Sequence, residues 1–96
     1  MSKEVTFKYR DRFIQLGIVI ASLRKINGMS QEEFADKVGI SRSLLSLIEA
    51  PNVAKSFSLE VLFSIADVLD ISPTDLLDAS LFPDNIINKD HKSSKT

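Results

Sequence analysis

Two short segments, each opened by a serine and separated by one glycine turn, dominate residues 30–49 of this chain. Ser30 is a favoured N-cap residue, and Glu33 stands three positions later, as in an S-x-x-E capping box. A second capping serine, Ser41, follows Gly39 by two positions and leaves room for a helix of about eight residues. The pattern predicts two short helices joined by a tight turn, and the rest of the chain must fold around this pair.

The apolar residues of the pair have the spacing that two packed helices need. Small Ala35 lets the helices approach closely, and Gly39 permits the left-handed backbone of the turn. Ile40 fills the corner, while Leu45 and Ile48 anchor the second helix from its inner side. Each helix is therefore predicted to bury one face.

The outer face of the second helix is left to short or hydrogen-bonding side chains and one leucine, which are Arg42, Ser43, Ser46 and Leu47. A protruding helix with so little bulk can enter a groove. The helix dipole disfavours a cation near a helix N-terminus, so an external phosphate or base is the more favourable partner for Arg42. Leu47 has two interpretations, a partly buried packing residue or a contact to a thymine methyl group.

Helical spacing also governs the rest of the chain, and the sequence predicts an all-α fold. A first helix is expected over residues 11–26, where apolar residues recur in steps of three and four before Asn27-Gly28 ends it. Ser58 caps a later helix, and Ser72-Pro73 opens a last short one that reaches Leu77 or beyond. Residues 5–9 alternate apolar and polar side chains, which fits a short strand or an early start of the first helix.

At 96 residues the chain is predicted to form one domain. We expect an N-terminal arm over 1–10, the domain itself over 11–78, an apolar C-terminal extension over 79–88 and a polar, disordered tail over 89–96. The predicted core consists of Leu23, Phe34, Ala35, Val38, Leu45, Ile48, Leu62, Ile65 and Leu69.

The large apolar side chains near the C-terminus are too many to be buried in so small a core. These residues are Leu76, Leu77, Leu81, Phe82, Ile86 and Ile87. They pack on a second apolar stripe of the first helix (Ile14, Ile18 and Val19), meet a second subunit, or do both. We expect both, with a two-fold dimer interface that contains Leu77, Leu81, Phe82 and Ile86. The alternative is a strap that packs within one monomer.

Composition excludes most site chemistry. The chain has no cysteine, and its single histidine, His91, lies in the polar tail, so we expect no disulfide, no metal site, no cofactor and no enzymatic activity. The longest apolar run, residues 16–21, is far shorter than the roughly 20 residues of a membrane span. Residues 1–12 are too charged for a secretory signal, so a cytoplasmic location without membrane association is expected.

The net charge of −1 conceals an uneven distribution. Residues 1–56 carry nine basic and six acidic side chains, whereas residues 57–88 carry six acidic side chains and no Lys or Arg. The first half of the chain is therefore suited to face phosphates while the second half turns away from them.

The Ser30–Glu49 segment resembles the helix-turn-helix of the lambda repressor/Cro family, also called the xenobiotic-response-element (XRE) family. The likeness extends from about Leu16 to Leu77 and includes the Gly28-Met29-Ser30-Gln31-Glu32-Glu33 and Ile71-Ser72-Pro73-Thr74-Asp75-Leu76-Leu77 runs. It implies a fold of five short helices and a two-fold dimer on double-stranded DNA, with the second helix of the motif in the major groove.

The resemblance also implies roles for individual residues. Gln31 contacts a phosphate, Ser41 and Ser43 contact backbone or base edges, and the residues that read bases are Arg42, Ser46 and Leu47. Lys55 contacts a phosphate if its loop follows the DNA backbone and is otherwise a solvated lysine. Arg24 and Glu49 form a structural ion pair between the first helix and the recognition helix.

This chain departs from the family's pattern at Leu47, Ala50 and Pro51, and the Ala50–Phe57 loop is longer than usual, which affects specificity and the loop's phosphate contacts. The leading hypothesis is a sequence-specific transcriptional regulator, a repressor that controls its own gene, bound as a dimer to a pseudo-palindromic operator. The alternative is an antitoxin or other protein-interaction module whose acidic C-terminal half binds a partner protein.

Overall fold

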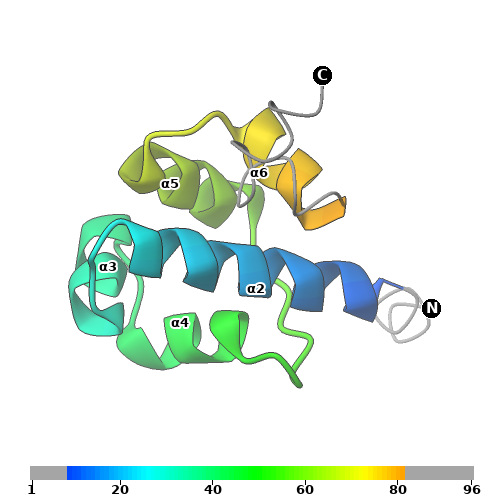
Figure 1. Ribbon diagram of the computed structural model, residues 1–96. Helices are drawn as coiled ribbons and strands as arrows, with labels where there is room; N and C mark the ends of the chain where they lie inside the picture. Colours follow the sequence, from blue (N-terminus) through cyan, green and yellow to red (C-terminus); the bar gives the residue numbers. More distant parts are fainter. Residues whose placement is uncertain (1–8, 82–96) are drawn as a thin grey trace.

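The computed structural model describes residues 9–81, and this part of the chain contains helices and no strand. The helices are α2 (Arg10–Ile26), α3 (Gln31–Val38), α4 (Arg42–Glu49), α5 (Leu59–Leu69) and α6 (Pro73–Leu81), as Figure 1 shows. The predicted all-α fold of five helices is confirmed.

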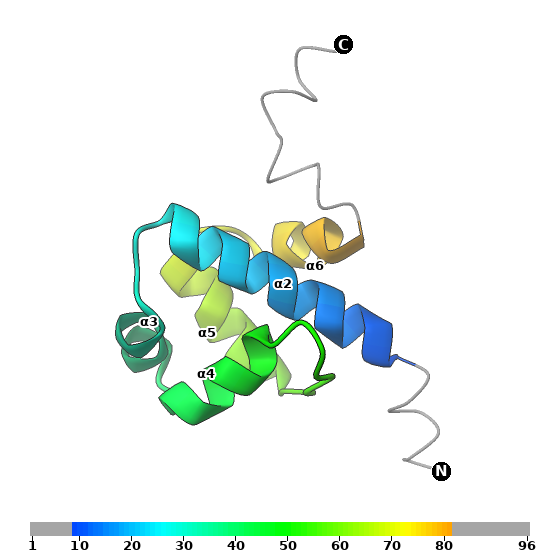
Figure 2. The ribbon, with the colours of Figure 1, turned by 60° about the horizontal axis from the view of Figure 1, so that its bottom comes forward.

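Helix α2 runs through the middle of the molecule and organises the others around it (Figure 1). It packs against α4 on one side and against α6 on the other, while α3 contacts both α4 and α5. Figure 2, which brings the underside forward, shows α4 lying on the outside of this assembly. The arrangement leaves one long face of α4 without a neighbouring helix.

The nine residues predicted to form the core are all buried. The core also contains Leu76 and Ala79 of α6, both with 0% exposure. The sequence places Leu76 beyond the family core and predicts that it packs on the first helix, and it is buried where α6 packs along α2 and extends the interior. Of the second apolar stripe on α2, Val19 is fully buried and Ile14 half-buried, whereas Ile18 is 36% exposed.

Serine caps set the starts of four helices. Ser30, Ser41, Ser58 and Ser72 each accept a hydrogen bond from the backbone N–H three residues later, at 3.1, 3.0, 3.2 and 3.0 Å. In the described part of the chain the Glu33 carboxylate makes no bond back to Ser30, so only half of the predicted capping box forms. Both groups are exposed, and water competes for this second bond.

The turn between α3 and α4 depends on Gly39, whose φ of 90° lies in the left-handed region. The N–H groups of Gly39 and Ile40 both donate to the Ala35 carbonyl, at 2.9 and 3.0 Å. This reversal places Ser41 directly at the N-cap of α4.

Gly17 determines how closely α2 and α4 approach. A Cβ atom added at Gly17 would overlap the backbone carbonyl oxygen of Ile48. Glycine is therefore required here by the contact between the two helices, and this contact fixes α4 on α2.

Two predicted boundaries differ from the structure. Helix α2 begins at Arg10, inside the arm predicted over 1–10, because the Tyr9 carbonyl already accepts the N–H groups of Arg12 and Phe13. Helix α6 continues to Leu81, so the first residues of the extension predicted over 79–88 are helical. Phe82, Ile86, His91 and the tail over 89–96 lie outside the described residues. None of the helices within residues 9–81 is long and apolar enough to cross a membrane.

Candidate nucleic-acid interface

The outer face of α4 brings together the four residues that the sequence assigned to it. Arg42, Ser43, Ser46 and Leu47 are all exposed and line one open hollow on the surface of this helix. Leu47 is 44% exposed, so it is not a core residue. The face combines one cation, two hydroxyl groups and one apolar group, which suits a ligand that offers acceptors and a methyl group.

The N-terminus of α4 is electropositive. Its first turn contains no acidic residue, and the Ser41 hydroxyl oxygen accepts the Leu44 N–H, which leaves the Ser41 hydroxyl proton free to donate. Within residues 9–81, Arg42 has no ion-pair partner. The helix dipole and the arginine therefore present positive charge in the same direction.

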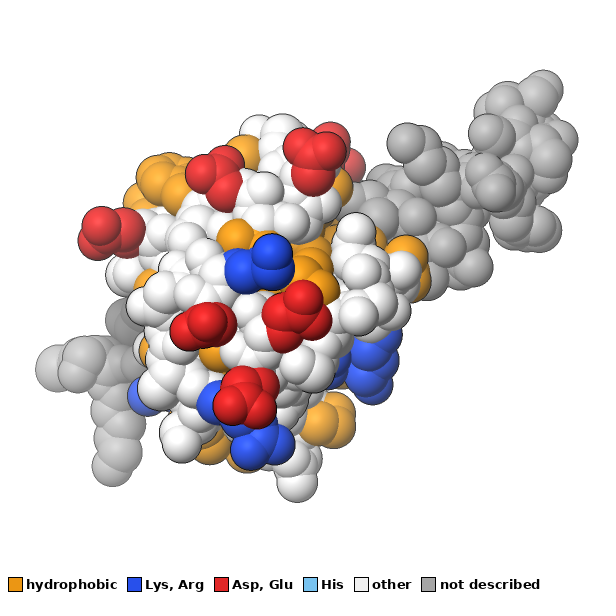
Figure 3. Space-filling view, turned by 90° about the vertical axis from the view of Figure 1, so that its left-hand side faces the viewer, with side chains coloured by type: hydrophobic (Ala, Val, Ile, Leu, Met, Phe, Trp, Pro, Cys, Tyr) orange, Lys and Arg blue, Asp and Glu red, His pale blue; other side chains and the backbone are white. Residues whose placement is uncertain are grey.

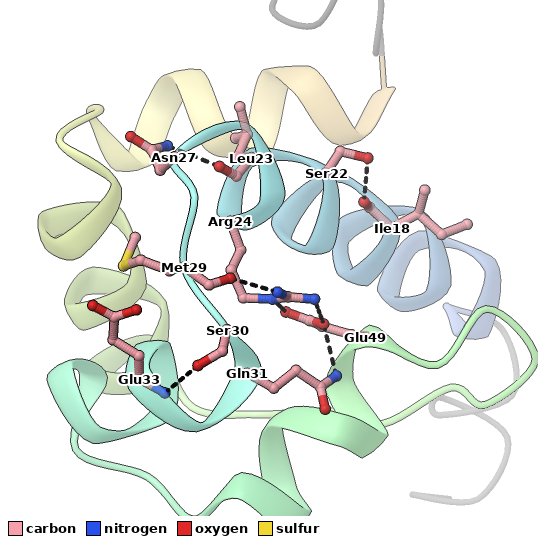
Figure 4. Close-up of polar contacts among 10 residues, drawn as sticks. All are labelled: Ile18, Ser22, Leu23, Arg24, Asn27, Met29, Ser30, Gln31, Glu33 and Glu49. Atoms are coloured by element: carbon pink, nitrogen blue, oxygen red, sulfur yellow. Dashed lines mark hydrogen bonds and ion pairs between the residues drawn. The ribbon is translucent and has the colours of Figure 1, made fainter.

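A buried ion pair holds α4 from its other end, at the site that Figure 4 shows. The Arg24 guanidinium donates to Glu49 through Nε to Oε2 at 2.8 Å and through Nη2 to Oε1 at 3.0 Å. Its Nη1 donates to the Met29 carbonyl at 2.7 Å. Both charged residues are only 7% exposed, so the pair that the resemblance implied joins α2 to the C-terminal end of α4 inside the fold.

Gln31 takes part in the same cluster, which the sequence did not indicate. Its Nε2 donates to Glu49 Oε1 at 2.9 Å, and its side chain is half-buried (Figure 4). The amide keeps a second N–H that can donate to a phosphate while the first stays on Glu49. No local pattern could have revealed this contact, because Gln31 and Glu49 are 18 positions apart.

Lys55 is exposed in the loop between α4 and α5 and does not line the hollow on α4. Like Arg42, it has no ion-pair partner within residues 9–81. The Val53 N–H donates to the Ala50 carbonyl at 3.3 Å and closes the turn at Pro51-Asn52 that leads into this loop. Lys55 therefore lies outside the hollow on α4, and a ligand bound to that hollow could reach Lys55 only if it extended beyond it.

The acidic second half of the chain lies away from α4. Glu60 and Asp67 belong to α5, and Asp75 and Asp78 belong to α6, two helices on the opposite side of α2 (Figure 1). Figure 3 shows the end of the molecule formed by α3 and α5, where acidic side chains are spread with a few basic ones between them. This end carries no continuous basic patch of the kind that attracts phosphates.

A profile of the helix-turn-helix family matches residues 20–76, which is more than half of the chain and includes α3 and α4. The chain belongs to this family. Its form is that of the lambda repressor/Cro-like, or XRE, proteins, a family of DNA-binding regulators and not a class of enzymes.

Relatives with this helix-turn-helix fold agree with that assignment. The chain is 40% identical over 63 residues to the HTH-type transcriptional regulator SinR of Bacillus subtilis (strain 168). The match covers 66% of this chain and 56% of that regulator, so the chain spans little more than half the length of the curated relative.

Two solved structures of helix-turn-helix regulators have the same fold. The clp gene regulator ClgR from Corynebacterium glutamicum superposes with a TM-score of 0.67 at 25% identity, over 88% of this chain and 87% of that one. A chain of the SinR protein/SinI protein complex gives a TM-score of 0.60 at 32% identity, over 76% of this chain and 80% of that one.

Proposed function

We propose that this protein is a sequence-specific transcriptional regulator that inserts α4 into the major groove of operator DNA. The observation that carries the proposal is the outer face of α4, where Arg42, Ser43, Ser46 and Leu47 share one exposed hollow that no other helix covers. The acidic side chains of α5 and α6 lie on the other side of α2, so they do not repel DNA docked there (Figure 1).

Each residue of this face has a role that its chemistry supports. Arg42 donates two hydrogen bonds to guanine O6 and N7, and Leu47 contacts a thymine methyl group. Ser43 and Ser46 donate to base edges or backbone. The phosphate contacts come from the residues at the ends of the motif and in the following loop, which are Gln31, Ser41 and Lys55.

The regulator acts as a two-fold dimer on a pseudo-palindromic operator. Leu77 and Leu81 of α6 are 44% and 49% exposed and support an apolar dimer interface. Phe82 and Ile86, which follow α6 and lie outside the described residues, complete that interface. Binding to both half-sites requires this dimer to hold its two α4 helices about 34 Å apart, which is one turn of DNA.

Selection of binding sites from random DNA tests the proposal. The wild-type protein should select an inverted repeat, and Arg42→Ala should lose about 1–3 kcal/mol of binding free energy and its preference at one base pair per half-site. Lys25→Ala, which removes an exposed cation from the end of α2, is the matched control and should select the wild-type site. If the Arg42 variant selects the unchanged motif, Arg42 does not read a base.

The sign of regulation is tested at the promoter. We propose repression, including repression of the protein's own gene, in which the bound dimer excludes polymerase. A reporter joined to the DNA upstream of the coding region should be repressed by the wild-type protein and released by Arg42→Ala. Activation of the reporter would overturn the repressor assignment.

A second function, the binding of a protein partner, is favoured by a separate observation. One structural relative was solved as a complex of the SinR protein with the SinI protein. The acidic residues on α5 and α6, with exposed Phe63, provide a surface for such a partner that leaves α4 free. An unchanged operator affinity together with co-purification of a basic partner would support this function.

A further inference from the structure

An apolar groove of about 240 Å³ lies between the N-terminal half of α2, the start of α5 and the last turns of α6. The rings of Phe13 and Phe57 meet edge to face within it, with centroids 5.8 Å apart. Tyr9, Leu59 and Leu77 also line it and are 42%, 66% and 44% exposed. Within residues 9–81 no helix closes the groove over Leu59 and Leu77, so it is suited to receive an apolar segment.

Arg12 supplies the single charge in the lining of this groove. Its guanidinium forms no ion pair or hydrogen bond with any side chain in the described part of the chain. The other lining residues with hydroxyl groups, Tyr9, Ser58 and Ser80, are uncharged. The best occupant is therefore a short apolar segment that carries one carboxylate.

The chain contains such a segment directly after α6. Helix α6 ends at Leu81, one residue beyond Ser80 in the wall of the groove. The following residues are Phe82-Pro83-Asp84-Asn85-Ile86-Ile87, with apolar groups at both ends and one acid between them.

We propose that residues 82–87 of one copy fill this groove of a second copy, reciprocally, with Asp84 opposite the partner's Arg12. The inference rests on the dimer of the proposed function and names the site that its interface residues occupy. Leu77 then contributes to the groove, Phe82 and Ile86 contribute to its occupant, and Leu81 lies next to the point where the segment crosses over.

The position of the groove favours exchange over a return to the same chain. Leu77 and Ser80 belong to the last turns of α6, so residues that lie beside both of them in the same copy must run back along α6. A β-turn takes four residues and leaves only Ile86 and Ile87 to fill the groove. From a second copy all six residues, which span at most about 20 Å, can lie along it. Two-fold symmetry makes this contact twice.

Disulfide trapping tests the exchange, because the native chain has no cysteine. Leu59→Cys protein and isotopically heavy Ile86→Cys protein are mixed, allowed to exchange subunits, oxidised and weighed by mass spectrometry. We expect a mixed disulfide at least about tenfold more abundant than that from Glu32→Cys mixed with Ile86→Cys, since a disulfide needs Cα atoms within about 7 Å. Glu32 is the control because it is exposed on α3, at the far end of α2.

Two outcomes would overturn the exchange. A mixed disulfide no more abundant than the control means that the groove does not hold this segment. An intramolecular disulfide in a dilute chain carrying both Leu59→Cys and Ile86→Cys means that the segment returns to its own groove. Leu59 is 66% exposed, so its replacement should leave folding intact, and a thermal melt checks this.

A charge exchange provides a second measurement by sedimentation. Arg12→Glu should raise the dimer dissociation constant roughly two- to fivefold, and Asp84→Lys in the same chain should restore it. Arg10→Glu is the control, since Arg10 lies outside the groove and faces Asp11 at 3.7 Å. An unchanged constant in Arg12→Glu would refute the pairing with Asp84.

Binding to a single operator half-site, measured in parallel, separates the two proposals. Half-site binding without the mixed disulfide overturns the exchange alone. The mixed disulfide without any DNA binding overturns the proposed function alone.

Discussion

The two arginines near the ends of α2, Arg12 and Arg24, lie in opposite environments. Near its C-terminal end Arg24 is 7% exposed and donates hydrogen bonds to Glu49 and to the Met29 carbonyl. Near its N-terminal end Arg12 is exposed at the edge of an apolar groove and has no ion-pair partner within residues 9–81. Arg24 therefore joins α2 to the rest of the fold, whereas Arg12 remains exposed and available to a ligand or a second copy.

The difference follows from the acceptors that the fold brings to each end. Glu49 from α4 and the carbonyl of Met29 converge on Arg24, so a bidentate, charge-assisted contact compensates its burial. No acceptor among the described residues converges on Arg12, and its charge stays in water. On α2, an arginine is therefore buried only where another helix places a carboxylate beside it.

The sharpest test of this contrast is the same substitution at both ends. Arg24→Met should lower the free energy of unfolding by about 3–5 kcal/mol, because it leaves Glu49 buried without its partner. Arg12→Met is the control and should change it by less than about 0.5 kcal/mol. Urea denaturation measures both.

The double variant Arg24→Met/Glu49→Leu separates burial of an unpaired charge from loss of packing. It should be more stable than Arg24→Met alone, since no charge then remains buried. Additive losses from the two single changes would show that the two side chains are not coupled.

The next largest effect compares the inner and outer faces of α4. Leu45 has 0% exposure, so Leu45→Ala should cost about 2–5 kcal/mol of stability. Leu47, two positions along and 44% exposed, should cost less than about 0.5 kcal/mol when changed to Ala. Chemical denaturation of the two variants distinguishes them, and equal losses would contradict the placement of Leu47 on the outer surface.

A smaller loss of stability is expected at Gly17, where the middle of α2 contacts α4. Gly17→Ala should destabilise the fold by about 1–3 kcal/mol, because the added methyl group overlaps the Ile48 carbonyl and forces the helices apart. Ile18→Ala, at an adjacent and 36% exposed position, is the control and should cost less. A thermal melt in which Gly17→Ala matches wild type would show that α4 can shift on α2 without cost.

The smallest effect on folding is expected at Leu81, the last residue of α6. Leu81→Ser should change the unfolding free energy of the monomer by less than about 0.5 kcal/mol, since Leu81 is 49% exposed. The same change should weaken self-association in sedimentation, because it removes an apolar group from the proposed dimer interface. A monomer destabilised by more than about 1 kcal/mol would place Leu81 in the core instead.

Much of the fold was predictable from local patterns. Ser30, Ser41, Ser58 and Ser72 mark helix starts because capping is decided within four residues of chain. The inner residues of α4 were equally clear, because helical periodicity states which side chains share a face. The outer face of α4 followed from the same periodicity, and for that reason the four residues of its hollow were predicted together.

Other features lay beyond local patterns. The hydrogen bond of Gln31 to Glu49 joins positions 18 apart, and the groove around Arg12 draws its walls from three helices. Leu76 was expected to pack on the first helix and at a second subunit, and only the packing of α6 along α2 shows that it is fully buried within one copy. The end of α6 was left open at Leu77 or beyond, since no proline or glycine marks it before Pro83.

By itself, the sequence determined the helices, their caps, the buried face of each and the side chains left on the outside of α4. These features depend on interactions within a few residues, so composition and spacing suffice to specify them. Only the tertiary structure decided that Gln31 joins the Arg24–Glu49 pair, how closely α2 approaches α4 at Gly17, and that an apolar groove remains open beside α6. Those features arise where distant segments converge, and their energies depend on distances and burial that no single stretch of sequence contains.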